Sequence, residues 1–600
     1  MNHATITQAL VAQADRRPKG RAFAFADREQ LGPILGYGEL LERSLCAAGR
    51  LAERGLRRGD RVLVCLPTSE ALLLAIYGVL CAGGTCIPVY PPLAGHGLPR
   101  WKDQVRAMAR VAQPRAAIVT AADRVHMAAA LAGGRTEAFV LEADELRTGK
   151  PVEPCPVAAD ELCFVQFTSG TTRAPRGVSV SHGALMANIR GMLAAMPLGE
   201  ADVSVSWLPP YHDMGLVGHV FTPVACGAYQ VLMPPTHFLV RPRRWLKLLS
   251  EVHATQTTAP NSGYSMCVHR VPREARTGLD LRALRWALCG AEMVLDETVT
   301  AFSQAYAPHG FPEMAFRPVY GLAEATLAAT FGPEGGARFD WVNRHRLADD
   351  DEAVPERPGA VDAQAFACVG LPIAEHEVRV VDGSGAPCRE RAVGEIWLRG
   401  PSLMSGYFND PIGTREVLRD GWLRTGDLGY RADGMLHVTG RAKELVIKAG
   451  RNYVPTDIEA ACLAEPELRR GRVVAFGLPN RLSGTEDLVI VAEVRDRRLV
   501  GQPELVQRIT AAVADRAGVR PDRVDLIQPG LLPKTTSGKL QRNRVRTAYE
   551  RGVPLGGATR ALRGRLAEAA LRVLPPRVVE RARSSAELVW SGLRKVLGWR

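Results

Sequence analysis

The chain has 600 residues, of which 46% are hydrophobic and 23% charged, a composition typical of a folded globular protein and not of a disordered one. One hydrophobic core rarely extends over such a length, so we expect at least two domains. Most of the net charge of +13 lies in residues 551–600, where eleven Arg and Lys face three Glu. In the rest of the chain, positive and negative residues are nearly equal in number. The chain also lacks any motif that contacts bases in a nucleic-acid groove, so the net charge does not indicate a nucleic-acid-binding protein.

The twelve cysteines are scattered, and no two of them form a C-x-x-C pair. This spacing argues against a disulfide framework and against a zinc site. We interpret the cysteines as small core residues of a protein in a reducing compartment. The first ten residues, MNHATITQAL, contain no apolar stretch of the secretory type. We therefore expect a cytoplasmic protein.

The first half of the chain alternates short β-prone runs with helical segments. Strands are expected at Arg61–Leu66, Ala116–Thr120 and Ala138–Leu141, and a helix begins at Glu70. Alternation of this kind predicts layered α/β structure with parallel strands.

The uncharged stretch Ala71–Tyr90 is long enough to raise the question of a membrane span. Gly83, Gly84 and Pro88 interrupt it, however. We expect a buried helix, a turn and a short strand instead.

From Glu377 onward the pattern becomes β-rich. Residues 377–400 predict a β hairpin or a small barrel, and residues 434–455 predict a second β stretch punctuated by glycine. The expected strand Asp487–Val494 and helix Pro503–Ala517 then indicate a compact second domain of about a hundred residues.

The C-terminal segment 556–600 is basic and amphipathic. Pro575 and Pro576 divide it into two expected helices, each with Leu or Val on one side and Arg on the other. Such helices can lie on an anionic membrane or against an acidic partner. The alternative is a helical pair packed on the protein's own surface, with its Arg side chains in solvent.

The segment FVQFTSGTTRAPRGV, residues 164–178, carries the strongest chemical signal. Its β-prone run ends in Thr168, Ser169, Gly170, Thr171 and Thr172, followed by Arg173 and Arg176. Hydroxyl and backbone N–H groups around a glycine can surround the oxygens of a polyphosphate. It is not a Walker loop, because no Gly-Lys-Ser/Thr follows. Taken alone, the segment also fits an ordinary polar loop after a strand.

Six further segments occur in order along the chain: WLPPYHDMGLVG (207–218), LCGAEMV (288–294), RPVYGLAEATL (317–327), WLRTGDLG (422–429), GRAKELVIKAGRNYVPTDIE (440–459) and LLPKTTSGKLQR (531–542). Together with the first segment they resemble the adenylate-forming superfamily of acyl-CoA synthetases, luciferases and nonribosomal adenylation domains, over roughly residues 10–550. The sequence of residues 207–218 and the long stretch after residue 327 most resemble those of the fatty acyl-AMP ligases. Those enzymes carry an insertion in the large domain, and we expect related extra sequence within or near residues 332–366 of this chain.

The resemblance implies an α/β fold in two parts. A large N-terminal AMP-binding domain, residues 1–442, would contain layered α/β subdomains and a small β-barrel-like subdomain. A small mobile α+β lid domain, residues 443–555, would carry the catalytic lysine, and residues 556–600 would form the basic helical tail.

The resemblance also implies roles for single residues. The ATP phosphates would be bound by Thr168, Ser169, Gly170, Thr171, Thr172 and Arg176. Adenine and ribose would be bound by Gly290, Ala291, Glu292, Tyr320, Gly321, Asp427 and Arg441. Asp427 follows Gly426 in the turn-like sequence TGDLG, so we expect it to lie in a loop. Arg173 stands where many relatives have Gly, and Arg176 where many have Lys; Arg keeps the charge but is not an equivalent group.

Four more positions complete the implied site. Glu324 would bind Mg²⁺, a hard cation that prefers carboxylate oxygen. His212 would lie beside the substrate carboxylate, and Lys443 would be the hinge of the lid. Lys539 would offset the charge that builds on the α-phosphate. Each of these residues alone would be interpreted as a solvated or structural group.

The implied reaction uses ATP and Mg²⁺ to convert a fatty acid to an acyl-adenylate, with release of pyrophosphate. The acyl group then passes to the phosphopantetheine thiol of an acyl carrier protein. A fatty acid–CoA ligase that uses free CoA is the alternative enzyme. A carrier- or membrane-docking protein with a degenerate ATP site is the non-enzymatic alternative, disfavoured because Glu324, Asp427 and Lys539 occur together.

Overall fold

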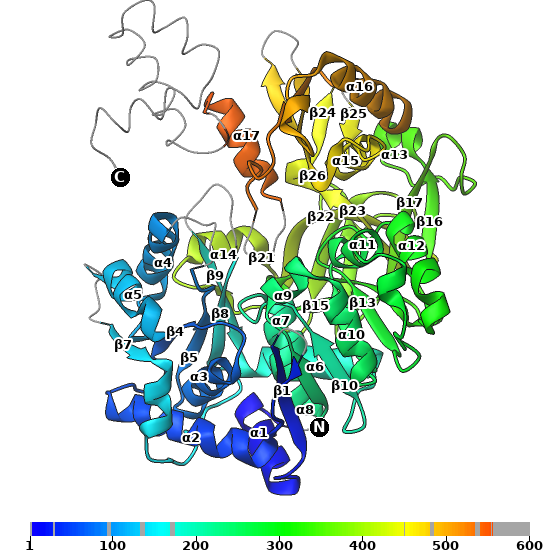
Figure 1. Ribbon diagram of the computed structural model, residues 1–600. Coiled ribbons are helices and arrows are strands. Elements are labelled where there is room, and N and C mark those ends of the chain that lie inside the picture. Colours follow the sequence, from blue (N-terminus) through cyan, green and yellow to red (C-terminus); the bar gives the residue numbers. More distant parts are fainter. Residues whose placement is uncertain are drawn as a thin grey trace, which may run out of the picture.

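The computed structural model describes residues 3–27, 30–92, 98–132, 138–168, 175–448, 451–480, 485–534, 540–553 and 555. This part of the chain forms two large sheets and a smaller C-terminal unit, drawn in yellow to orange at the top of Figure 1. The predicted basic tail, residues 556–600, lies outside the described residues.

The first sheet has the strand order β20-β9-β8-β5-β4-β6-β7. Strands β4, β5, β6 and β7 run parallel, which confirms the prediction from the alternating pattern. The strands are β4 (Arg61–Cys65), β5 (Thr85–Pro88), β6 (Ala116–Val119), β7 (Phe139–Glu142), β8 (Leu162–Thr168), β9 (Arg176–Ser181) and β20 (Gly406–Tyr407). The helices of this stretch are α1 (Ile6–Arg16), α2 (Tyr37–Glu53), α3 (Glu70–Cys81), α4 (Leu98–Ala112) and α5 (Arg124–Leu131).

The apolar stretch Ala71–Tyr90 forms α3, a turn and β5, as the sequence predicted. Ser69 caps the helix, because its side chain accepts a hydrogen bond from the N–H of Leu72. The helix is buried within the protein, and its Tyr77 hydroxyl donates to the carbonyl oxygen of Val220 at 2.9 Å. Among the described residues, no helix has the length and apolar character that crossing a bilayer requires.

The second sheet has the order β18-β19-β22-β23-β17-β15-β14-β13-β12-β10-β11-β1-β2. Its parallel strands are β1 (Arg21–Asp27), β10 (Val203–Ser206), β11 (Tyr229–Leu232), β12 (Gln256–Ala259), β13 (Trp286–Cys289) and β14 (Phe316–Gly321). The antiparallel strands are β2 (Gln30–Leu31), β15 (Ala328–Phe331), β17 (Ala363–Pro372), β18 (Glu377–Val381), β19 (Gly394–Arg399), β22 (Trp422–Ala432) and β23 (Met435–Arg441). The short strands β3 (Leu35–Gly36), β16 (Phe339–Asn343) and β21 (Leu418–Arg419) pair at its sides.

The predicted hairpin at residues 377–400 is confirmed, because β18 and β19 pair antiparallel. The predicted β-barrel-like part continues from the parallel strands of the second sheet through β15 and β17. The remaining helices of this region are α6 (His182–Ala195), α7 (Asp213–Leu216), α8 (Thr222–Cys226), α9 (Pro235–Val240), α10 (Arg243–Glu251), α11 (Asn261–Arg270), α12 (Asp296–Tyr306), α13 (Arg344–Asp350) and α14 (Pro411–Val417).

One continuous hydrophobic core joins the two sheets. Helices α3 and α6 contribute to it together with strand residues from both sheets, such as Phe164 of β8 and Leu232 of β11. The cysteines also lie inside the protein: nine of the twelve are buried and the other three are half-buried. This agrees with their interpretation as small core residues. The shared core fixes the two sheets relative to each other.

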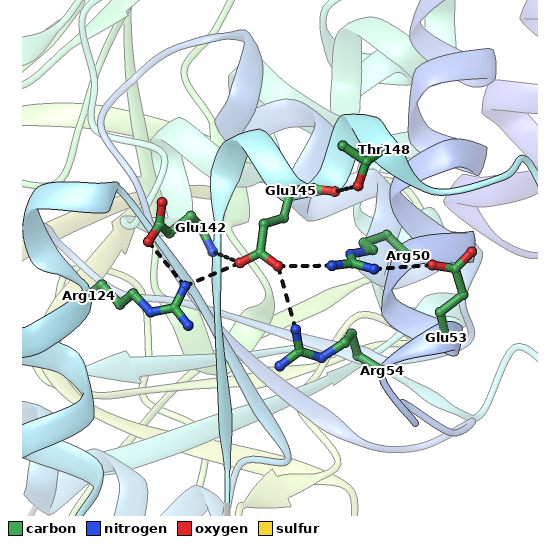
Figure 2. Close-up of polar contacts among 7 residues, drawn as sticks. All are labelled: Arg50, Glu53, Arg54, Arg124, Glu142, Glu145 and Thr148. Atoms are coloured by element: carbon green, nitrogen blue, oxygen red, sulfur yellow. Dashed lines mark hydrogen bonds and ion pairs between the residues drawn. The ribbon is translucent and has the colours of Figure 1, made fainter.

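A charged cluster fastens the edge of the first sheet to α2 (Figure 2). The Glu145 carboxylate accepts hydrogen bonds from Arg50 at 3.0 Å, from Arg124 at 3.3 Å and from the backbone N–H of Glu142 at 3.1 Å. Arg54 lies 3.5 Å from the same carboxylate. None of these residues belongs to the predicted nucleotide site, and we interpret the cluster as structural.

The C-terminal unit has its own hydrophobic core and its own three-stranded sheet, in the order β26-β27-β28. Its elements are β24 (Val446–Lys448), β25 (Arg451–Tyr453), α15 (Pro455–Cys462), β26 (Leu468–Asn480), β27 (Thr485–Val494), α16 (Pro503–Ala517), β28 (Arg523–Ile527) and α17 (Arg542–Glu550). Strand β27 and helix α16 lie where the sequence predicted them. A separate core is what an independent lid domain requires, so we keep the predicted boundary at residue 443 as a proposal.

The segment after β15 faces the C-terminal unit. Its helix α13 and strand β16 lie beside α15 and α16 at the upper right of Figure 1. The Asp349 carboxylate of α13 forms a 2.9 Å ion pair with Arg451, and Gln364 donates to Asp457 at 2.5 Å. A cavity of about 590 Å³ lies between the two parts, and no residue predicted to bind ATP lines it. We therefore do not assign it to the nucleotide.

Asp457 makes this contact sensitive to pH. Burial raises the pKa of its carboxyl to about 7, against the opposing effects of Gln364 and Arg344. In the unfolded chain the group loses its proton near pH 4. Between about pH 4 and 7 the folded protein therefore holds a proton that the unfolded chain releases. Over this range the group lowers the free energy of unfolding as the pH rises. Above about pH 7 it causes no further change.

We expect Asp457→Asn to raise the thermal unfolding midpoint, and to raise it more at pH 8 than at pH 5. Scanning calorimetry of wild type and variant at both pH values checks this. The exposed Asp515 of α16 provides the matched control Asp515→Asn. A difference between wild type and Asp457→Asn that is the same at both pH values would show that Asp457 ionises normally.

Candidate active site

The predicted site residues follow the carboxyl ends of three strands, where α/β sheets commonly bind ligands. Thr168 ends β8 and pairs with Arg176 at the start of β9. Gly290 follows β13, and Gly321 ends β14. A side chain at Gly321 would place its Cβ 1.8 Å from the carbonyl oxygen of Leu327, so only glycine fits there. Ser169, Gly170, Thr171 and Thr172 lie outside the described residues.

The predicted adenine segment turns sharply after β13. Ala291 has a φ of 67°, in the left-handed region. The next residue, Glu292, is held in place because its carboxylate accepts hydrogen bonds from the backbone N–H of Ser262 at 2.8 Å and from its hydroxyl at 3.2 Å. The segment is thereby fixed against the N-terminal turn of α11.

Asp427 is the best-defined polar group of the site. Its side chain is 7% exposed. One carboxylate oxygen accepts a 2.7 Å hydrogen bond from the Tyr320 hydroxyl, and the other accepts one from Nε of Arg441, also at 2.7 Å. The charge of Asp427 raises the pKa of Arg441, and burial raises that of Tyr320. Each oxygen keeps a lone pair, so the group can still accept from two neighbouring hydroxyls of a ribose.

The prediction that Asp427 lies in a loop is wrong. It lies within the long strand β22 and pairs with Arg441 of β23. The preceding Gly426 has a φ of 71°, so the strand changes direction there without ending. The Thr-Gly-Asp sequence is good turn chemistry, but pairing along two long strands overrides that local preference.

Glu324 lies in a short 3-10 turn, Ala323–Ala325, between β14 and β15. One carboxylate oxygen accepts a 2.9 Å hydrogen bond from the hydroxyl of Tyr407. The ring of Tyr407 in turn lies 4.9 Å from the guanidinium group of Arg176. Tyr407 therefore links Glu324, which is predicted to bind the metal, to Arg176, which is predicted to bind the phosphates. Sequence reasoning missed it, because a single Tyr in SGYFND has no distinctive spacing.

The surroundings of Glu324 fit a bound divalent cation. Burial raises the pKa of this carboxyl, and the hydrogen bond from Tyr407 only partly opposes the effect. The nearby Asp213 carboxylate acts on the pKa in the same direction as burial. A half-buried carboxylate that is oriented by a neutral hydroxyl donor is a favourable ligand for Mg²⁺.

His212 caps α7, and its Nδ1 accepts a hydrogen bond from the backbone N–H of Met214 at 3.4 Å. The same nitrogen lies 2.5 Å from the carboxylate of Asp213. The preceding residue, Tyr211, receives a 2.8 Å hydrogen bond from Gln166 of β8 through its carbonyl oxygen. The predicted acid-binding segment is thus attached to the strand that leads into the phosphate loop.

Tyr320, Asp427 and Arg441 form one connected polar group, and Tyr407 connects Glu324 to Arg176. The sequence model of the AMP-binding enzymes matches residues 10–408. The chain belongs to this family. Among AMP-binding enzymes, the long-chain-fatty-acid–AMP ligase FadD26 of Mycobacterium marinum is 34% identical over 90% of this chain and 96% of its own length.

Two further proteins are similar over the same extent. A Caulobacter vibrioides protein, provisionally named an acyl-CoA synthetase, is 35% identical over 91% of this chain and 96% of its own. A solved structure from a study of fatty acyl-adenylate ligases of E. coli and L. pneumophila has a TM-score of 0.86, with 34% identity over 92% of this chain and 98% of that one. The expected α/β fold of an AMP-binding enzyme is confirmed.

The segment that carries Lys539 begins beside the adenine segment of this AMP-binding enzyme. Lys534 and Leu540 pair as a β-bridge, and the residues between them, Lys539 included, lie outside the described residues. Burial lowers the pKa of Lys534 to about 8, and the nearby Glu292 carboxylate opposes this change. The C-terminal unit also contacts α11, where Arg470 donates to His269 at 2.7 Å. Lys534 therefore lies near Glu292, one of the residues predicted to bind adenine.

The predicted hinge, Lys443, lies in the 3-10 turn Ala442–Glu444 that connects β23 to the C-terminal unit. Its side chain is outside the described part of the structure. The next residue, Glu444, is paired with Arg542, which also bonds Glu459 at 2.9 Å. The start of the C-terminal unit is thus connected by an ion pair to Arg542, three residues after Lys539.

Proposed function

We propose that this protein uses ATP to activate a fatty acid and then passes the acyl group to an acyl carrier protein. A carboxylate oxygen of the acid attacks the α-phosphorus, the bond to the β-phosphate oxygen breaks, and pyrophosphate leaves. The carrier's phosphopantetheine thiol then attacks the acyl carbonyl, and AMP leaves. The observation that carries the proposal is the buried Asp427 carboxylate, which Tyr320 and Arg441 position. A second connected group supports it, in which Tyr407 links Glu324 to Arg176.

Each predicted residue has a role in this reaction. Asp427 accepts the ribose hydroxyls, and Arg441 orients its carboxylate through the 2.7 Å hydrogen bond from Nε. Arg176 and the hydroxyls at Thr168 and beyond bind the phosphates. Lys539 offsets the charge that develops on the α-phosphate, which is the kind of contact that accelerates a transfer most. No covalent enzyme intermediate is required, because positioning and charge supply the catalysis.

We also propose Mg²⁺ as the metal that Glu324 binds. When bound, it would neutralise charge on the phosphates. The chain's own contribution is the carboxylate of Glu324, which Tyr407 orients through its hydroxyl.

The second half-reaction requires the site to admit a thiol, so we propose that the C-terminal unit rotates about Lys443. Lys443→Pro would fix φ at this position and trap one orientation. We expect it to impair one half-reaction much more than the other. Acyl-adenylate formation, and acyl transfer from added acyl-adenylate, are measured separately. The variant Lys448→Pro, within β24 of the C-terminal unit, is the control for a general backbone effect. Equal losses in both steps for Lys443→Pro would contradict a rotation at this residue.

Free CoA is the alternative acceptor, and the name of the Caulobacter relative favours it. The two acceptors separate in one experiment. The protein, ATP, Mg²⁺ and a panel of fatty acids are incubated with CoA and with a carrier protein that bears phosphopantetheine, and the products are identified by mass spectrometry. We expect acyl-carrier protein and little acyl-CoA. Acyl-CoA as the main product would assign the alternative.

The basic tail supports a further part of the proposal, which is cytoplasmic location with peripheral contact to an anionic membrane. Its support is the excess of Arg and Lys in residues 551–600. Sedimentation with vesicles of phosphatidylserine and phosphatidylcholine, at low and high salt, compares the full chain with residues 1–555. Binding that is salt-independent or unaffected by the truncation would remove this part of the proposal.

A further inference from the structure

The loop that carries Glu324 has an unusual backbone. Thr326 has φ 72° and ψ −55°, close to the rare and strained γ-turn geometry. A β-branched residue strongly disfavours positive φ, because its side chain crowds the backbone. Such strain persists only where the surroundings hold the residue firmly, and it concentrates at functional sites. The contacts of this loop therefore show what holds Glu324.

A single buried side chain on α6 makes three of these contacts. Asn188 is fully buried. Its amide nitrogen lies 3.1 Å from the carbonyl oxygen of Ala325 and 2.8 Å from that of Ala328, and its amide oxygen accepts from the N–H of Ala328 at 3.1 Å. The Asn188 amide thus bonds the chain on both sides of Thr326.

Ser402 contacts both the Asn188 side chain and the Glu324 loop. Its hydroxyl lies 3.0 Å from the Asn188 amide nitrogen and donates to Ala325 at 3.2 Å. Its carbonyl oxygen accepts a 2.6 Å hydrogen bond from the Thr326 hydroxyl. Two residues later, the N–H of Met404 donates to the carbonyl oxygen of Glu324 itself at 2.8 Å. Segment 402–407 therefore supports both the backbone of Glu324 and, through Tyr407, its carboxylate.

We infer that Asn188 is a positioning residue, which holds the Glu324 loop in the strained conformation that presents the carboxylate to the metal. This inference rests on the proposed role of Glu324. Asn188 lies on α6, the helix that follows β9, and it contacts the Glu324 loop through the backbone atoms of residues 325 and 328. Without it, the carbonyl oxygen and the N–H group of Ala328 would lose their Asn188 partner, the carbonyl oxygen of Ala325 would keep only Ser402, and the turn could relax.

The test uses Asn188→Ala and the milder Ser402→Ala, which removes only the hydroxyl. Binding of Mn²⁺ to the protein with a non-hydrolysable ATP analogue is measured by electron paramagnetic resonance, and acyl-adenylate formation is measured over a range of Mg²⁺ concentrations. Loss of a group that supports a metal ligand typically weakens metal binding about 10–100-fold. We expect a shift of about 10-fold in both measurements for Asn188→Ala, and a smaller shift in the same direction for Ser402→Ala.

Acyl transfer from added acyl-adenylate should be unchanged, because it needs no metal carboxylate. Asn343→Ala, which removes the cap of α13 away from the site, is the matched control for lost stability. Lower thermal stability of the Asn188 and Ser402 variants with unaltered metal dependence would overturn the inference. If Asn188→Ala does not fold, an unchanged metal dependence of Ser402→Ala overturns it equally. Failure of the wild type to form acyl-adenylate would instead contradict the proposed function.

Discussion

Lys539→Ala is expected to abolish acyl-adenylate formation while leaving acyl transfer from added acyl-adenylate intact. The loss of one contact that stabilises developing charge typically lowers a rate by about 10²–10³-fold. Lys539 lies outside the described residues, in the segment that follows Lys534, and Lys534 is close enough to Glu292 for that carboxylate to act on its pKa. The two half-reactions are measured separately, by pyrophosphate release and by acylation of the thiol acceptor.

The matched control for this variant is Lys448→Ala. Lys448 is also a lysine of the C-terminal unit, but its ammonium group is occupied by a 2.6 Å ion pair with Asp522. It should leave both half-reactions near the wild-type rate. Adenylation by Lys539→Ala at a comparable rate would refute the assignment of Lys539, and loss of both half-reactions would point to a structural defect.

Asp427→Ala is expected to weaken ATP binding severely. The carboxylate would accept two ribose hydroxyls, and hydrogen bonds to a charged group contribute about 1.5–3 kcal/mol each. Removing both therefore predicts a loss of about 10²–10⁴-fold in affinity. The effect should be enlarged because Arg441 and the Tyr320 hydroxyl would lose their shared partner. Isothermal titration with ATP measures the change.

Asp433→Asn is the control for Asp427. Asp433 lies in the turn between β22 and β23, on the same hairpin, but is exposed to solvent. The affinity of this variant for ATP should equal that of the wild type. If Asp427→Ala also binds ATP normally, the ribose does not contact this carboxylate and the adenine–ribose assignment is wrong.

Much of the fold could be predicted because local sequence and tertiary structure agree. The helix at Glu70 begins after a Ser cap and ends before two glycines, and the structure places α3 and β5 accordingly. Helix α16 also has the predicted bounds, since Pro503 opens it and Gly518 follows it. At these positions capping, turn and burial preferences all favour the same structure.

The site residues that sequence reasoning missed are defined by tertiary contacts. Tyr407 and Asn188 each meet the Glu324 loop from positions far away in the chain, and neither lies in a distinctive motif. Asp427 was misplaced for a related reason, because its turn-like sequence is overridden by pairing between β22 and β23. Sequence patterns indicate which residues a motif contains, whereas the partners that orient them come from other strands and helices.

Fatty-acid-dependent exchange of pyrophosphate into ATP tests the proposed reaction most directly. The first half-reaction is reversible through the acyl-adenylate, so labelled pyrophosphate should enter ATP only when ATP, Mg²⁺ and a fatty acid are all present. We expect exchange with at least one member of a fatty-acid panel, and its loss in Lys539→Ala and Asp427→Ala. Formation of ADP and phosphate, or no exchange with any acid, would contradict the proposed reaction.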